Sequence, residues 1–494
     1  VTLRALLIGL VLIPIHCYWV TVIEVRWYTL DGSCLPLFVE PVFFLFLLTL
    51  ANLPLRLLRR SAALSQGELL VIYIMLVMSM TMAGHDMLQN LFGVIAHPFR
   101  FATPGNKWES LFWPLIPRWL FVSDVRQVNN FYEGRGSPFS LEALGVWLPP
   151  LFNWGLFVAA LVVALLAVAF LLNRPWSREE KLSYPIIQVP LRLTDDQGTV
   201  LLRNRTMWLG FGAAALADAY NGLNTYFPNV PPFQLRQYPI GQYLTNPPLN
   251  AIQGTRISFY PFMIGLAFFL PQDLQFSCWF FFVLRLVEQV TGRVAGWDAV
   301  PGFPFFNEQG SGAWLGLALI ALWVARRHLW AALRHAAGLK THLAADEKRW
   351  PYALAFAALA GTGAYFWLFV RAMGMTWPIA LAFFSVFFLL SIAISRVRAE
   401  LGAPHEIFFV NPQTIIAETL GTVRLSAKNM TAMNCLFWFN RCYRCHPMPN
   451  QIEALKMAEE RSLGTGSIAL VTLLGALVSI PVAFWANLKV TYQY

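Results

Sequence analysis

The sequence predicts an all-α protein, a polytopic bundle of about 11 transmembrane helices, and two observations lead to this fold class. Of the 494 residues, 57% are hydrophobic and only 13% are charged, whereas a soluble domain contains about 25% charged residues. The apolar residues also gather in long runs, and the run from Leu156 to Leu172 carries no charge. Because a helix needs ~20 mostly apolar residues to cross a bilayer, we interpret these runs as membrane spans rather than as one large soluble core.

The expected spans follow one another along the whole chain, so we treat residues 1–494 as a single integral membrane domain. Several spans are short or contain Gly or Pro, which indicates broken or tilted helices. In chain order they run from Leu6 to Ile23, Leu37 to Leu55, Leu69 to Ala83, Pro150 to Leu172, Met207 to Leu223, Ile257 to Leu270, Leu274 to Val290, Gly312 to Ala325, Pro351 to Val370, Trp377 to Ile394 and Gly464 to Trp485.

Arginine and lysine residues predict the orientation, because short loops rich in them stay in the cytoplasm. With the N-terminus inside, the basic residues between 56 and 60, between 174 and 205 and between 326 and 349 all fall in cytoplasmic loops. The short loops on the opposite side carry few basic residues. We therefore expect a cytoplasmic N-terminus, with Arg396 and Arg398 as cytoplasmic anchors at the end of the tenth span.

Two loops are long enough to be structures in their own right. Residues 84–149 form an external loop rich in Trp and Pro, and its stretch from Leu111 to Val122 suits an interfacial lid. Residues 395–463 form a cytoplasmic loop with two semi-apolar stretches, Ile407 to Leu420 and Met430 to Phe439. Either stretch is a candidate re-entrant hairpin, which is tolerated at membrane depth where protein or a water cavity satisfies its backbone.

Ionisable residues inside spans are the best guide to a site, because each is costly in hydrocarbon and usually faces the bundle interior or a cavity. Glu40 lies in the second expected span. Asp218, Asn221 and Asn224 lie in or beside the fifth, at spacings that place them on roughly one helical face. This stripe predicts either a cavity lining or hydrogen bonds that merely hold helices together.

Two junctions between loops and spans add further candidates for a substrate path. Glu308 and Gln309 precede the glycines that open the eighth span, an arrangement in which a helix N-terminus can face a ligand. His85 and Asp86 lie at the outer end of the third span, where a titrating histidine can gate protons.

The sharpest single motif is Cys442-Tyr-Arg-Cys445-His446, which has the spacing of covalent haem attachment. Two thiols one helical turn apart can bind both vinyl groups, and the following histidine can be an axial ligand. Such attachment occurs on the outer face of the bacterial membrane, whereas the charge distribution places this loop inside. We therefore interpret the motif as a coincidence and expect no cofactor and no bound metal.

Charge and motif content exclude other classes of function. The 36 Lys and Arg residues against 26 Asp and Glu residues give a net charge of +10, which positive cytoplasmic loops explain, so we expect no nucleic-acid partner. The sequence contains no nucleophile elbow, nucleotide-binding loop or zinc-protease motif. We therefore do not expect an enzyme.

Several segments resemble a known family. They are Leu64-Ser-Gln-Gly-Glu-Leu-Leu-Val-Ile-Tyr73, Lys181-Leu-Ser-Tyr-Pro185, Arg396-Val-Arg-Ala-Glu-Leu-Gly-Ala-Pro404 and His446-Pro-Met-Pro449 followed by Glu453. The resemblance covers most of the chain and is to an uncharacterised family of large bacterial integral membrane proteins, distantly similar to oligopeptide transporters. It implies a location in the bacterial inner membrane and provides no established substrate or catalytic residues.

Two functions follow as hypotheses. The first is a secondary transporter that moves a small organic or peptide-like solute with a coupling ion. The alternative is a structural or anchoring subunit of a larger membrane assembly, which binds membrane-protein partners through an aromatic-rich surface. In both cases the lipid bilayer surrounds the protein. Stoichiometric partners on purification favour the second hypothesis, and substrate-dependent uptake favours the first.

Overall fold

The computed structural model shows a bundle of helices, and it describes residues 1–28, 32–59, 61–233, 237–345, 347–403, 406–407 and 410–493. Within these residues there is no β-strand, and one isolated bridge joins Tyr238 to Ile257. The all-helical fold class is therefore confirmed.

The α-helices are α1 (Leu3–Thr21), α2 (Val39–Leu58), α3 (Gln66–Ala83), α4 (Asn90–Arg100), α5 (Trp108–Leu111), α6 (Val125–Glu133), α7 (Leu141–Arg174), α8 (Pro185–Leu193), α9 (Thr199–Leu202), α10 (Arg205–Tyr226), α11 (Pro261–Ala267), α12 (Gln272–Ala295), α13 (Phe306–Ala336), α14 (Arg349–Ala372), α15 (Trp377–Leu401), α16 (Pro412–Leu420), α17 (Ala427–Cys435), α18 (Pro447–Glu460) and α19 (Thr465–Gln493). Short π and 3₁₀ turns connect them: η1 (Val22–Trp27), η2 (Gly32–Cys34), η3 (His85–Gln89), η4 (Trp113–Leu115), η5 (Arg118–Leu120), η6 (Pro175–Glu179), η7 (Asp195–Gly198), η8 (Ile240–Tyr243), η9 (Leu249–Ile252), η10 (Trp297–Ala299), η11 (His342–Ala345), η12 (Thr422–Arg424) and η13 (Phe437–Phe439).

Eight helical segments of the described chain are long and apolar enough to cross a membrane. Each overlaps one of the predicted spans, and this content of apolar helices is consistent with a membrane protein. They are Leu3–Trp27, Val39–Leu58, Gln66–Arg100, Leu141–Glu179, Phe306–Ala336, Arg349–Ala372, Trp377–Leu401 and Thr465–Gln493.

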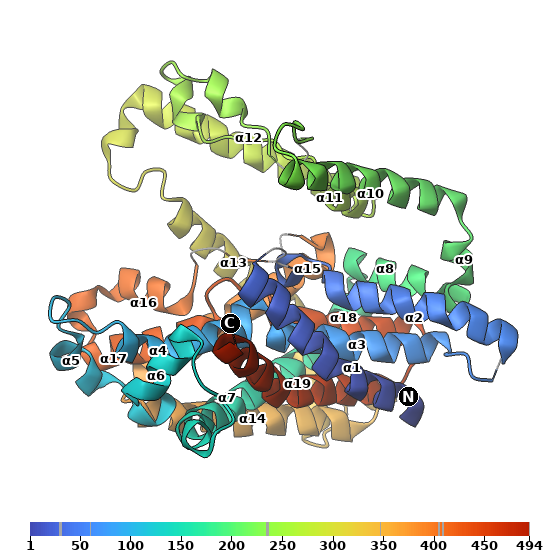
Figure 1. The fold of residues 1–494 in the computed structure, drawn as a ribbon, viewed down its shortest axis with the longest axis horizontal. Helices are drawn as coiled ribbons and strands as arrows, with labels where there is room; N and C mark the ends of the chain where they lie inside the picture. Colours follow the sequence, from blue (N-terminus) through green and yellow to red (C-terminus); the bar gives the residue numbers. More distant parts are fainter. Residues whose placement is uncertain are drawn as a thin grey trace.

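The other three predicted spans, which begin at Met207, Ile257 and Leu274, are not confirmed. Helix α11 has only 7 residues and is too short to cross a bilayer. Helices α10 and α12 have the length, but they lack a sufficiently apolar continuous stretch. Figure 1 shows this part of the chain set apart from the main bundle. No side chain of α10 is buried, and its contacts with the bundle include Trp208 and Phe211 against Phe46 of α2.

Helix α3 lies at the centre of the bundle. It begins with a capping box: the Ser65 hydroxyl accepts from the backbone N–H of Glu68, and the Glu68 carboxylate accepts from the backbone N–H of Ser65. From Glu68 to Ala83 every side chain is buried, because the helix is apolar all round and has no polar face to turn outward. Helices α1, α2, α18 and α19 pack around it.

After α15 the chain returns along the bundle before it forms α18. The backbone N–H of Tyr184 donates to Ala399 near the end of α15, whereas the N–H of Thr376, at the start of α15, donates to Asn429 of α17. Asn429 therefore lies beside the start of α15, although it follows the end of that helix in the sequence. Helix α18 then begins beside the middle of α15, where the His446 ring contacts Phe387.

Two segments predicted on opposite sides of the membrane lie at the same end of the bundle. Helix α17, from the segment 395–463, packs against η4, from the segment 84–149. In Figure 1, α5, α6, α16 and α17 gather at that end. The first segment is folded: Trp113 donates to Pro98, and Leu120 accepts from Trp154. Its role as a lid remains a prediction, as does a re-entrant hairpin in the second.

Candidate functional site

A buried ion pair joins Arg398 of α15 to Glu453 of α18. The Arg398 Nε donates to one carboxylate oxygen at 2.7 Å, and its Nη2 donates to the other at 2.9 Å. The same Nη2 also donates to Asn450 Oδ1 at 2.8 Å. Arg398 is 3% exposed and Glu453 is 5% exposed. A fork-to-fork arrangement of this kind is the geometry that best compensates for burying two charges.

The local sequence explains how these side chains meet. Asn450 and Glu453 stand three residues apart, so they share one face of α18. Prolines at 447 and 449 occupy the first turn, where a missing N–H costs no helical hydrogen bond. Helix α15 ends at Gly402, whose φ of 73° suits glycine, and Arg398 lies one turn earlier.

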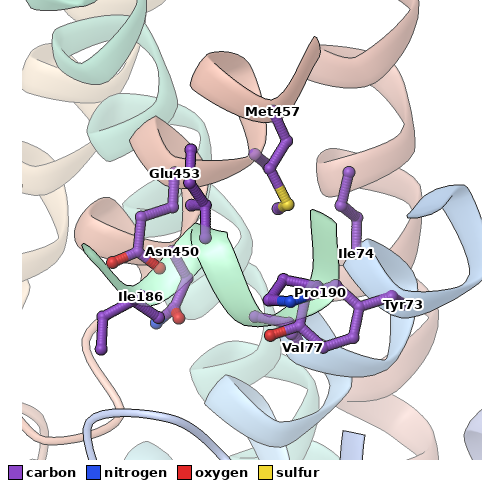
Figure 2. Close-up of a pocket in the computed structure, with 10 residues that line it drawn as sticks. Tyr73, Ile74, Val77, Ile186, Pro190, Asn450, Glu453 and Met457 are labelled. Carbon is purple, nitrogen blue, oxygen red and sulfur yellow. The ribbon is translucent and has the colours of Figure 1, made fainter. Parts of the chain in front are cut away.

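A small pocket adjoins the ion pair (Figure 2). It lies between Asn450 and Glu453 of α18 on one side and Tyr73 of α3 on the other. The space inside it has room for about one water molecule. Most of the wall is apolar, and its lining residues are Tyr73, Ile74, Val77, Ile186, Ile187, Pro190, Asn450, Glu453, Ala454 and Met457.

Tyr184 adds a second phenol beside the pair. It adopts a left-handed conformation with φ 45° at the start of α8, where Pro185 opens the helix. Burial, followed by the nearby charge of Glu453, raises the pKa of the Tyr184 hydroxyl well above its ordinary value. The phenol is therefore a neutral polar group at physiological pH, and its buried oxygen has no hydrogen-bond partner among the described residues.

Comparison with known proteins gives a family and no function. The match is to a family of unknown function (DUF6785) and covers residues 1–494. The chain belongs to this family. No curated protein and no solved structure matches it. The expected similarity to oligopeptide transporters, and the bacterial origin, therefore gain no support from these comparisons.

The segments that carried the sequence resemblance converge on this one site of the DUF6785 chain. Tyr73 ends the first segment and Tyr184 lies in the second. Arg398 lies in the third, and Glu453 follows the fourth. The third segment ends at Pro404, which lies outside the described residues. Sequence reasoning did not name this pair as a site, although the shared motifs contained the signal.

Arg398 is not the surface anchor that we predicted. Its guanidinium is enclosed by α15 and α18, because Glu453 and Asn450 satisfy it inside the bundle. Arg396, two residues earlier, lies closer to the surface and pairs with Glu180 and Glu400. The two arginines look alike in sequence, and only the tertiary structure separates them.

Three predicted candidates lie together in a second polar cluster, near the start of α2. Glu40 is buried beside Gly32. The backbone N–H of His85 donates to the Ser33 hydroxyl at 3.0 Å. Asp86 is buried and lies 3.4 Å from the Nε of Arg444. This cluster also contains residues that sequence reasoning missed, namely Glu24, Ser33, Gln89, Glu406 and Arg444.

The candidates on α10 lie apart from both buried clusters. Asp218 is exposed. Asn221 accepts from the N–H of Phe233, and Asn224 donates to the carbonyl of Val230, so both amides hold the loop that follows α10.

Glu308 and Gln309 also lie outside the buried clusters. Both are exposed in the first turn of α13. Gln309 donates to Glu288 and to the carbonyl of Pro304, so its amide joins α13 to α12 and to the preceding turn.

The residues of the haem-like motif are packed against protein. A Cβ on Gly84 would lie 2.6 Å from the Cys445 sulfur, so that thiol fills the space beside the glycine. The His446 ring contacts Phe387 and Tyr443, and burial lowers the pKa of His446 to about 3. Cys442 is buried as well. The three side chains help to pack the N-terminus of α18 against the neighbouring helices.

Proposed function

We propose that this protein is a secondary transporter of a small solute that carries both a carboxylate and an ammonium group, such as a peptide-like compound. The observation that carries this proposal is the buried Arg398–Glu453 pair beside a small, mostly apolar pocket. The proposal assigns the chain no catalytic chemistry. It places the protein in a bacterial inner membrane with a cytoplasmic N-terminus, in line with the distribution of basic residues.

The ion pair matches a solute of this kind because each charged group of the solute can replace one charged side chain of the pair. A solute carboxylate can take the place of Glu453 on the Arg398 guanidinium, whose planar fork suits bidentate binding. A solute ammonium can take the place of Arg398 on Glu453. Each buried charge then keeps a partner, whereas a buried charge without a partner would be strongly unfavourable. The apolar residues of α3 and α8 that line the pocket can contact an uncharged side chain of the solute once the pocket widens.

The course of the chain supports the same proposal. Helix α18 begins inside the bundle, beside the middle of α15, and with 14 residues it is too short to cross a bilayer. Transporters use such interrupted helices to place substrate groups near the middle of the membrane. We interpret α18 and the segment before it as re-entrant structure, whose backbone polar groups are tolerated at membrane depth because protein surrounds them.

The structure corresponds to a closed state in this proposal, because the pocket has room for about one water molecule. A solute larger than water needs α8 to move away from α3 and α18. Helix α8 has only 9 residues, and Pro190 in its interior removes a helical hydrogen bond. It is therefore the element that we expect to move.

Uptake into proteoliposomes tests this function. Libraries of amino acids and dipeptides are offered under an imposed proton or sodium gradient, and any transported compound is then offered in N-acetylated and C-amidated forms. We expect blocking either end to abolish uptake, and we expect R398Q to abolish uptake as well. The matched control is R396Q, which removes an arginine from the same helix outside the buried pair. Uptake that survives both blocking and R398Q would contradict the proposal.

The arm formed by α10, α11 and α12 favours a second candidate function, that of a structural subunit. Large apolar side chains of α12 are exposed on several faces, among them Phe276, Trp279 and Phe281. We propose a transmembrane helix of a partner protein as the occupant, since α12 belongs to an arm that stands apart from the main bundle (Figure 1), where the short turns η9 and η10 pack against it. Purification in mild detergent followed by native mass spectrometry tests this. A stoichiometric membrane-protein partner, lost when Trp279 and Phe281 are changed to serine, would support assembly, and an unaccompanied chain would contradict it.

A further inference from the structure

Two carboxylates from different helical elements meet at the turn formed by Gly32 and Ser33. Glu24 comes from η1 and is 1% exposed, and Glu40 comes from the first turn of α2 and is 3% exposed. The backbone N–H of Ser33 donates to Glu24. A Cβ on Gly32 would overlap both carboxylate oxygens of Glu40, so that carboxylate points directly at the turn.

The two carboxylates differ in their hydrogen bonding. One oxygen of Glu24 accepts from Ser33 N at 2.8 Å, and the other accepts from Gln89 Nε2 at 3.0 Å. Neither oxygen of Glu40 has a hydrogen-bond partner among the described residues, although both are buried. The dipole of α2 offsets only a small part of the cost of a buried negative charge. Glu40 is therefore the member of the pair that needs neutralising.

The charged groups around the pair do not supply that neutralisation. From η3, Asp86 adds a further acidic group and His85 contributes its backbone N–H. The neighbouring segments bring Cys34, Glu406, Arg444 and Cys445. Within the described part of the chain, no arginine or lysine forms an ion pair with Glu24 or Glu40, and Arg444 contacts Asp86 and Glu406 instead.

We propose that Glu40, facing Glu24, is a proton-binding site, and that its proton is the coupling ion for transport. Both carboxylates are buried at the same turn, and two such buried carboxylates cannot both be ionised without a compensating cation. A sodium ion requires about five or six oxygen ligands by analogy with the hard cations. Among the described side chains of this cluster, the buried oxygens without a hydrogen-bond partner are the two of Glu40 and Oδ2 of Asp86, and the latter lies against Arg444. A proton needs one oxygen. The assignment to transport rests on the proposed function, but the proton site itself does not.

A short series of contacts connects this site to the Arg398–Glu453 pair. The Cys445 thiol donates to the carbonyl of Ser33 at 3.6 Å. Cys445 directly precedes His446, the N-cap of α18, and α18 carries Glu453. A change at the turn formed by Gly32 and Ser33 therefore reaches the start of α18 through one side chain. This gives protonation of Glu40 a direct physical route to the position of α18.

Infrared difference spectroscopy of the purified full chain in lipid tests the proton site without any substrate. A protonated buried carboxyl gives a carbonyl band that is separate from the carboxylate bands and shifts in deuterated water. We expect such a band at neutral pH, its loss in E40Q, and its retention in E109Q, which changes an exposed glutamate. The band unchanged in E40Q would overturn the proposal, as would its disappearance when sodium chloride replaces an equal concentration of a large organic chloride salt at constant pH.

A second variant keeps the test decisive if E40Q fails to fold. The G32A variant leaves both carboxylates in the chain but places a methyl group against Glu40. We expect G32A to shift or abolish the same band, and a G32A spectrum identical to that of the unmodified protein would contradict the assignment. Because these spectra need no transported compound, a negative result here leaves the uptake assays unaffected, and a failed search for substrates leaves the proton site testable.

Discussion

Arg398 and Glu453 lie 55 positions apart in the sequence and form two hydrogen bonds with each other in the interior. Their pairing fixes α18 against α15 in the interior, where both side chains are almost completely buried. Whether a charged pair in this position contributes mainly to stability or mainly to function can be separated by experiment.

Removal of one partner should destabilise the protein strongly. We expect R398M or E453L alone to lower the free energy of unfolding by about 3–5 kcal/mol, because the remaining charge is buried without a partner. The double variant R398M/E453L should recover most of that loss, since two apolar side chains of similar volume replace the pair. Thermal unfolding in detergent measures both effects, with R396Q as the control. A double variant as unstable as the single ones would contradict this account.

The last helix should depend on a hydrogen bond at its end. Trp147 Nε1 donates to the Tyr492 hydroxyl at 2.8 Å, and that hydroxyl donates to the carbonyl of Gln127 at 3.2 Å. The variant Y492F leaves the buried indole N–H without its acceptor, so we expect a loss of about 1–3 kcal/mol. Hydrogen exchange should increase at the end of α19 and in α6. Y226F, at an exposed tyrosine, is the control and should change neither stability nor exchange.

Close packing of α19 on α3 depends on a glycine. A Cβ on Gly475 would lie 3.2 Å from the Cα of Met75 and 3.3 Å from its carbonyl oxygen. Since these are backbone atoms, G475V should force the two helices apart and destabilise the protein by about 1–3 kcal/mol. The control is G363A in α14, where nothing lies near the added methyl group. That change should be neutral or stabilising by up to about 1 kcal/mol. Equal effects of the two variants would rule out the packing explanation.

His446 should contribute to acid sensitivity. Burial lowers its pKa to about 3 in the folded state, whereas an unfolded histidine has a pKa of about 6.5. Between these values the unfolded state binds a proton that the folded state does not, so stability falls as pH decreases from about 6.5 to about 3, by about 1.4 kcal/mol per unit.

In the variant H446Q this side chain no longer binds a proton in the unfolded state. We expect its unfolding temperature to fall less than that of the unmodified protein between pH 6.5 and pH 4.5. H342Q, at an exposed histidine, should follow the unmodified protein. Parallel pH profiles for H446Q and the unmodified protein would contradict a neutral buried imidazole.

Sequence reasoning predicted the helical class and most long helices, because continuous apolar runs such as Leu156 to Leu172 leave few alternatives. The three spans it predicted between 205 and 295 are not confirmed; apolar residues are frequent there, but Asp218, Arg285 and Glu288 interrupt them. Hydropathy alone does not reveal that such a helix stands outside the bundle.

The site was predictable only in part, for a physical reason. Glu40 was found because a carboxylate in an apolar stretch is conspicuous, and Asp86 was found beside His85 at the outer end of a predicted span. Arg398 was missed because an arginine at the end of a span usually reaches the surface, and its partner Glu453 lies in a short polar helix with no hydropathy signal. An ion pair between distant segments depends on tertiary packing, and residue spacing within one helix does not predict that packing.

The short length of α18 also bears on how the protein is made. With Asn450, Gln451 and Glu453 in its first half, α18 cannot enter the bilayer as an independent segment during synthesis. It can take its place only when α3, α7 and α15 already surround the space and α19 follows to enclose it. In the re-entrant arrangement proposed above, the charge pair is therefore among the last contacts to form. A chain that has not completed it would expose an unpaired arginine in the membrane, a feature by which quality-control proteases can distinguish unfinished molecules from finished ones.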